Sequence, residues 1–308
     1  MDMRPDSFYK KAFILFFALA LSPPAMAKQD DKIAQARERA EQYAKKSEAY
    51  RKQPARKLSQ AELKAEELFA RAEVMVALAE SPSQVEPALK LCREATQLAP
   101  GYDKAWWELA KSIWAQAMLM PSKTSEQKQA AASALARARE ACNRALKIDP
   151  VSAGGNYWLS NIILSDAGLK NPVRQVFILP EIFRLTDKVA ELDPYFDYGA
   201  VFRTYATVLS VVPRWLSKSV GYEPEIILPY LDKSIALYPD CFVNYISRSE
   251  VYLKMGDAES KSKALQDLEY VLTHDPDALK GYEADNRSRQ KAARARWKQI
   301  TGKDFPGN

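Results

Sequence analysis

The chain has 308 residues, with 45 Lys and Arg against 39 Asp and Glu and a formal net charge of +6. A single histidine, three cysteines and no Cys-x-x-Cys pair exclude a zinc site of familiar ligand spacing, and the sequence has no glycine-rich phosphate loop. We therefore expect a protein that is not an enzyme and that carries no metal and no cofactor.

The first 27 residues have the pattern of a secretory signal peptide. A basic start precedes the apolar run 12–21, and Ala25-Met26-Ala27 supplies the small-x-small pattern of a cleavage site. A membrane anchor is the alternative, but the run is shorter than the ~20 residues that span a bilayer. We expect cleavage near Ala27, a soluble periplasmic protein and no transmembrane segment after cleavage.

Residues 28–57 form a basic charged arm with ten Lys and Arg against five Asp and Glu. Such an arm can bind acidic lipid or nucleic acid. The alternative is a solvated helix whose alanines, Ala34, Ala36, Ala40 and Ala44, face nothing in particular. Mixed charges and few aromatic residues favour the solvated helix, and export disfavours nucleic acid as a partner.

Five prolines divide the rest of the chain into similar stretches of helix, turn and helix. They are spaced 50, 44, 45 and 37 residues apart, and they are Pro100, Pro150, Pro194, Pro239 and Pro276. Each follows the end of a helical pattern, where its missing N–H group and its ring stop a helix. Periods in this range are typical of stacked helix pairs.

Small or β-branched residues recur in register with these prolines, where the two helices of a pair must approach closely. Twelve residues before each proline stand Ala88, Ala138, Ile182, Ile227 and Ala264. Five residues before stand Ala95, Ala145, Val189, Ser234 and Val271, and ten after the first four stand Ala110, Ser160, Thr204 and Ser249. Three such columns are hard to obtain by chance.

In chain order, the pattern predicts an all-α stack of about five antiparallel helix pairs within one domain, residues 58–300. The pairs are expected over 58–79 with 85–98, 103–120 with 125–148, 153–167 with 178–192, 198–212 with 225–238, and 241–254 with 259–273. Ser59 and Glu62 form a capping box for the first helix. Residues 278–300 should form a basic C-terminal capping helix, because terminal repeats must cover the stack, and 301–308 a tail.

The pattern resembles the tetratricopeptide repeat, with longer spacings than the usual 34 residues. Over residues 157–297 the chain is similar to the T component of TRAP transporters, in Asp193-Pro194-Tyr195, Gly199, Arg203, Pro213, Leu231-Asp232-Lys233-Ser234 and Pro239. That resemblance implies a periplasmic protein that associates with the substrate-binding component of an uptake system.

The first helix of each pair should line the concave face of such an array. The residues four, seven, eleven and fourteen positions after each proline then face the groove. The candidate binding residues among them are Trp107, Lys111, Trp114, Tyr157, Asn161, Tyr198 and Tyr205. The same register holds Lys104, Gly154, Leu164, Val201, Val208, Val243, Ile246, Glu250 and Leu253. Large amphipathic rings suit a partner or an apolar ligand, although all of these rings could instead be core.

Other single residues carry narrower expectations. Trp106 and Tyr245 should pack inside their own repeats, and residues 211–221 could form a lid with Trp215 at its tip. Cys92 and Cys142 occupy the same phase of successive repeats and should be buried free thiols. Cys241, at a helix start, is the cysteine we expect to be most reactive.

The sequence leads to two functions without catalysis. The first is a TRAP-associated T component that binds a protein partner in the periplasm, such as the substrate-binding component, and a small apolar or organic-acid ligand. The alternative is a periplasmic tetratricopeptide scaffold for an envelope assembly, in polysaccharide export or secretion, that holds a partner peptide. The sequence leaves open whether the chain forms a homo-oligomer. An enzyme would need clustered ionisable residues, which the predicted face does not offer.

Overall fold

The computed structural model describes residues 29–52, 56–170, 177–211 and 223–306, and these residues form helices and no strand. The expected signal peptide and nearly all of the suggested lid, including Trp215, lie outside the described residues. No helix within the described ranges is both long and apolar enough to cross a membrane.

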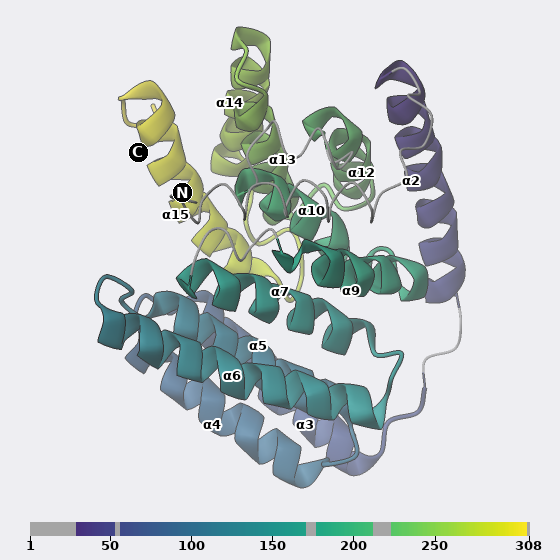
Figure 1. Cartoon of the computed structure of the whole chain (residues 1–308), viewed down its shortest axis with the longest axis vertical. Coiled ribbons are helices and arrows are strands. Elements are labelled where there is room, and N and C mark those ends of the chain that lie inside the picture. The colour runs from purple at the N-terminus through teal and green to yellow at the C-terminus, as the bar shows by residue number, and fades with distance from the viewer. Residues whose placement is uncertain (1–28, 53–55, 171–176, 212–222, 307–308) are drawn as a thin grey trace, which may run out of the picture.

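The helices follow one another in the predicted order (Figure 1). They are α2 (Gln29–Arg51), α3 (Gln60–Ala77), α4 (Pro82–Leu98), α5 (Asp103–Leu119), α6 (Ser125–Ile148), α7 (Ala153–Lys170), α9 (Leu179–Leu192), the 3₁₀ turn η1 (Phe196–Tyr198), α10 (Ala200–Val211), α12 (Pro224–Leu237), α13 (Phe242–Met255), α14 (Ala258–Thr273) and α15 (Glu283–Thr301). Consecutive helices pack as α3 with α4, α5 with α6, α7 with α9, α10 with α12 and α13 with α14. The predicted all-α stack of five pairs is therefore confirmed.

The capping residues that start the first helix and the columns of small and β-branched residues that set the repeat register are found where the sequence predicts them. The Glu62 backbone N–H donates to the Ser59 hydroxyl at 3.3 Å, and the Ser59 N–H donates to the Glu62 carboxylate at 2.7 Å, which completes the capping box of α3. All three columns of small and β-branched residues are buried, with at most 2 % of any member exposed. The repeat register thus correctly predicts a set of buried small and β-branched residues that let the paired helices approach closely.

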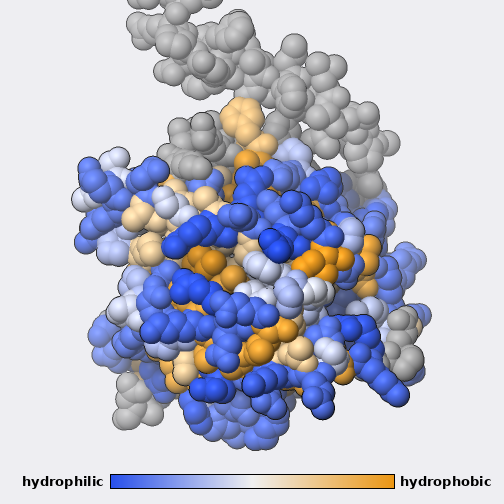
Figure 2. Space-filling model, turned by 90° about the horizontal axis from the view of Figure 1, so that it is seen from below, coloured by the Kyte–Doolittle hydropathy of each residue, from blue (hydrophilic) through white to orange (hydrophobic). Residues whose placement is uncertain are grey.

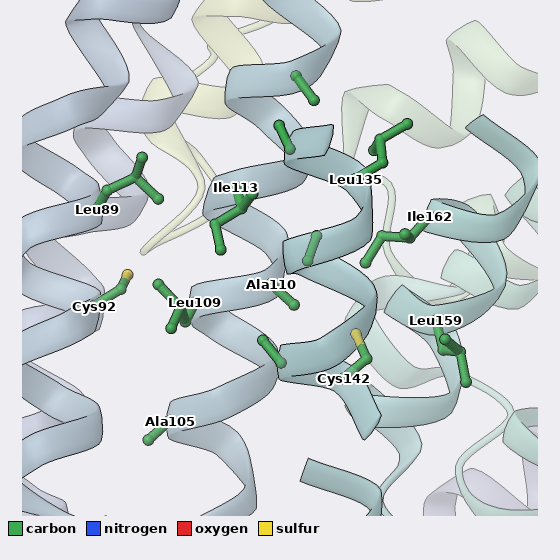
Figure 3. Close-up of a cluster of buried hydrophobic side chains, with 14 of the residues drawn as sticks. Leu89, Cys92, Ala105, Leu109, Ala110, Ile113, Leu135, Cys142, Leu159 and Ile162 are labelled. Carbon is green, nitrogen blue, oxygen red and sulfur yellow. The ribbon is translucent and has the colours of Figure 1, made fainter. Parts of the chain in front are cut away.

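The largest hydrophobic core lies between the first pairs (Figure 3). Leu89 of α4, Leu109 of α5, Leu135 of α6 and Ile162 of α7 are among the side chains that converge there. Burying a leucine-sized side chain is worth about 1.5–3 kcal/mol, so this layer holds successive pairs in a fixed relation.

The three cysteines are free and buried. For Cys92 and Cys142 this is the predicted state. For Cys241 the expectation of reactivity is wrong, because the residue is fully buried at the start of α13 and its thiol is not exposed. Burial raises the pKa of the Cys241 thiol to about 12, so the reactive thiolate is disfavoured.

The basic arm departs from the expectation of a helix that faces nothing. Within α2, Ala36 and Ala40 are only 3 % and 2 % exposed, whereas Ala34 is exposed. The helix packs along α12, which is distant in sequence (Figure 1). Lys233 of α12 forms an ion pair with Glu41 at 2.8 Å. The alanines form a narrow stripe that a short sequence window cannot distinguish from a solvated helix.

The last helix returns to the first pair. Besides α14 and α13, α15 contacts α3, and Lys291 of α15 forms an ion pair with Glu80, which follows α3. The predicted capping helix therefore also closes the array on itself. The first helices of the pairs, together with α15, surround the space that this closure creates.

Candidate functional site

A half-open cavity of about 1030 Å³ lies where the two ends of the array meet. Its wall comes from α3, α5 and α7 of the first pairs and from η1, α10, α13 and α15 of the later part. On the face shown in Figure 2, by contrast, hydrophilic residues dominate and hydrophobic residues show only in smaller patches. The cavity is the candidate binding site.

Four candidate residues lie on the cavity wall: Lys111, Trp114, Tyr157 and Asn161. Leu164, Val243, Ile246 and Glu250, from the same predicted register, line it too. Counting from the prolines thus selects most of the inward face of α5, α7 and α13, whereas Lys104, Gly154 and Leu253 of the same register are not lining residues.

Three aromatic rings form a continuous part of this wall. The Trp114 and Trp158 rings lie 5.4 Å apart between centroids, and Tyr157 meets Trp158 edge to face at 5.1 Å. The Trp114 indole N–H donates to the Ser165 hydroxyl at 2.8 Å, which fixes the orientation of its ring. Such contacts make a rigid apolar surface that loses little freedom when a ligand binds.

The other three candidate residues are not part of the cavity wall. The Trp107 ring covers the backbone of Gly154, where an added Cβ would meet the ring at 2.4 Å, and it packs edge to face with Phe196 at 5.9 Å. Trp107 is thus a spacer between α5 and α7. Tyr198 packs edge to face against Tyr238 and Tyr282.

Tyr205 donates a hydrogen bond to Asp187 of α9, away from the cavity. The turn at η1 explains why Tyr198 and Tyr205 fall out of register. Asp197 and Tyr198 have φ of 48° and 56°, a left-handed conformation that costs a non-glycine residue about 1 kcal/mol or more. Because α10 begins only at Ala200, Arg203, Ala206 and Thr207 face the cavity in place of Val201, Tyr205 and Val208.

The two narrower aromatic expectations have different outcomes. Tyr245 is 5 % exposed and stacks on Tyr270 within its own pair at 4.2 Å, as predicted. Trp106 is only half-buried, with the Arg144 guanidinium over its ring at 4.5 Å and its N–H donating to the Pro100 carbonyl.

A first ionic cluster surrounds Lys111. Its ammonium group is paired with Glu73 of α3 and lies 3.5 Å from the buried carboxylate of Glu108. Burial raises the pKa of Glu108, and the nearby Lys111 opposes this shift. Burial alone would lower the pKa of Lys111, but Glu108 and Glu73 outweigh it, so the pKa is raised and the lysine stays charged.

A second ionic cluster centres on Arg203, which is 7 % exposed. Its guanidinium donates to the Asp197 carboxylate at 2.6 Å, to the Asp197 carbonyl at 2.7 Å and to the Asn244 side-chain oxygen at 2.9 Å. The Tyr282 hydroxyl donates to the other Asp197 oxygen. These bonds hold the strained Asp197 backbone on the cavity wall.

A third charged group comes from the start of α15 and its neighbours. Arg289 donates to Asp285 at 3.0 Å, and Arg296 holds Glu250 through two bonds of 2.6 and 2.7 Å. Glu283 also lines the cavity.

Sequence reasoning missed this clustering of ionisable residues, and it wrongly expected none at the inward face. Glu73 precedes the first proline, and α15 reaches the cavity only through the closure of the array. In the described part of the chain, no three His, Cys, Asp or Glu side chains are grouped so as to hold a metal ion.

Comparison with known proteins gives no identification. No protein-family model matches the chain, and no curated protein matches its sequence.

Proposed function

We propose that this protein binds a small organic ligand in the cavity and presents it to a protein partner, without chemical conversion of the ligand. The observation that carries the proposal is a cavity of about 1030 Å³ with an aromatic wall and fixed charges. Sites for small molecules are commonly of this size, mostly apolar, with a few placed polar groups.

The fold supports a ligand site more than an open peptide groove. A partner peptide needs a long accessible concave face, whereas contact between α15 and α3 bounds the space from the far side. The alternative function is an envelope scaffold that holds a partner peptide, and the co-purification experiment below distinguishes the two.

For the cellular role we propose a periplasmic T component of a TRAP transporter, with the substrate-binding component as partner. The support is the resemblance in Asp193-Pro194-Tyr195, Gly199 and Arg203. Of these residues Arg203 lines the cavity, where it donates to Asp197 of the turn that follows Asp193-Pro194-Tyr195. Co-purification with a substrate-binding component encoded beside this chain would support the role, and capture of a polysaccharide-export or secretion protein instead would contradict it.

Native mass spectrometry of protein purified from the periplasm tests the binding proposal. We expect a bound small molecule that is released on denaturation, and its occupancy should fall at least about tenfold in Trp114→Ala, because a central aromatic contact is lost. Trp106→Ala is the matched control, since it removes the same side chain from a position of α5 outside the cavity wall and should leave occupancy unchanged. A protein that is always empty, or a ligand lost equally in both variants, would contradict the proposal.

A further inference from the structure

We propose that the cavity selects an organic cation, an ammonium-type group carried on an apolar body, and excludes organic acids. The inference rests on the proposed ligand-binding function and names the chemical class of its ligand. Glu283 is the proposed counter-ion, and Trp114, Tyr157 and Trp158 are the proposed apolar wall.

The charges on the wall are unbalanced towards acid. Three cationic side chains line the cavity, Lys111, Arg203 and Arg289, against five carboxylates, Glu73, Asp197, Glu250, Glu283 and Asp285. Arg296, beside the wall, pairs with Glu250, so one carboxylate remains in excess. A charged ligand that enters this space therefore gains more as a cation than as an anion.

Each cation of the wall is already paired. Lys111 is bound by Glu73, Arg203 by Asp197 and Arg289 by Asp285. A ligand carboxylate would have to displace one of these partners and leave a carboxylate poorly compensated in a partly enclosed space, which is costly. The cavity thus has no free cation for an organic acid among its described lining residues.

The start of α15, a feature of the wall that would attract an anion, is also occupied. A helix N-terminus favours negative charge, and α15 begins at the cavity. Its first turn already carries Glu283 and Asp285. The chain therefore supplies its own anions at this position.

Glu283 is the carboxylate left for a ligand. Glu250 is held by Arg296, Asp285 by Arg289, Asp197 by Arg203 and Glu73 by Lys111. No hydrogen bond or ion pair to the Glu283 side chain occurs within the described residues, although it is half-buried on the wall. A cation there would gain a charge partner in a cavity whose wall also carries the Trp114, Tyr157 and Trp158 rings.

Three probes that share a benzyl group test the class. Benzyltrimethylammonium, benzyl alcohol and phenylacetate are added to the full exported chain, and binding is measured by saturation-transfer NMR and titration. We expect the cation to bind at least about tenfold more tightly than phenylacetate, with benzyl alcohol between them, and the preference to weaken at high salt. Glu283→Gln keeps the shape and removes the charge, and it should weaken binding of the cation roughly three- to tenfold with no effect on benzyl alcohol.

Glu140→Gln is the matched control, because Glu140 is exposed on α6, which contributes nothing to the cavity wall. Phenylacetate bound as tightly as the cation would overturn the inference and leave the binding function intact. An unchanged affinity in Glu283→Gln would overturn the assignment of the counter-ion. If none of the three probes binds and no ligand co-purifies, both the inference and the proposed function fail.

Discussion

At the scale of the residue, the buried guanidinium of Arg203 is the polar group on which the cavity wall most depends. Arg203→Met should destabilise the protein by roughly 3 kcal/mol, because the Asp197 carboxylate and the Asn244 side chain lose their shared donor in a buried setting. Urea unfolding followed by circular dichroism measures the change.

Arg139→Met is the control for this prediction. Arg139 forms an exposed pair with Glu181 at 3.8 Å, so its loss should cost less than about 1 kcal/mol. Equal effects of the two substitutions would show that Arg203 is no more than a surface residue.

Glu108 gives a prediction about pH. Its pKa is raised by burial from the ordinary value of 4.5 towards neutrality, so the folded state holds this proton at pH values where the unfolded state has lost it. The group's contribution to stability is thus present below pH 4.5 and is lost as pH rises through the raised pKa. Glu108→Gln, which is always neutral, should therefore gain stability over the wild type between pH 4.5 and 7.5, by about 1–2 kcal/mol. Thermal unfolding of both proteins across this range measures the gain, and a constant difference would contradict the assignment.

The sequence could predict part of the site at this scale. Lys111, Trp114, Tyr157 and Asn161 reach the wall because α5 and α7 are regular helices, so a count from the preceding proline keeps its phase. Tyr198 and Tyr205 do not, because left-handed residues at η1 shift the start of α10. This shift in helix register depends on hydrogen bonds from Arg203 and Tyr282 to Asp197, and no local sequence pattern encodes them.

At the scale of the element, α2 tests how a polar helix is held. Ala40→Glu should detach α2 from α12, because Ala40 is only 2 % exposed and its site has no room for a carboxylate, whose charge would be buried at a high cost. The backbone carbonyl of Ala40 also accepts a hydrogen bond from the Tyr195 hydroxyl, which packing of α2 brings into place. Hydrogen exchange in α2 should then rise to the rate of an unprotected helix. Ala34→Glu makes the same change at an exposed position of the same helix and should leave protection unchanged. Protection that survives Ala40→Glu would contradict the packing of α2 on α12.

The predicted and missed elements differ in the range of their contacts. The five pairs and their caps follow from signals within about 40 residues, namely helix stops, capping residues and columns of small side chains. The docking of α2 on α12 and the return of α15 to α3 join segments nearly 200 residues or more apart. A single sequence carries no periodic signal for such pairings, so they could not be predicted.

At the scale of the whole molecule, the closure of the array turns a row of inward-facing helices into a bounded cavity. Without the contact between α15 and α3, Glu283 and Tyr282 would not face Trp114 and Tyr157 across a shared space. The proposed binding function and the proposed ligand class both depend on this closure.

Zero-length cross-linking with a carbodiimide tests the closure most directly, because it joins a lysine to a carboxylate that already touches it. The unmodified protein should yield a cross-linked peptide that joins Glu80 to Lys291, the ion pair between the two ends of the array. Lys104 and Glu66, 2.7 Å apart on neighbouring helices of the first pairs, should cross-link whether the array is open or closed and serve as the control. A closed array gives both products, whereas the control product without any link between Glu80 and Lys291 would contradict the account.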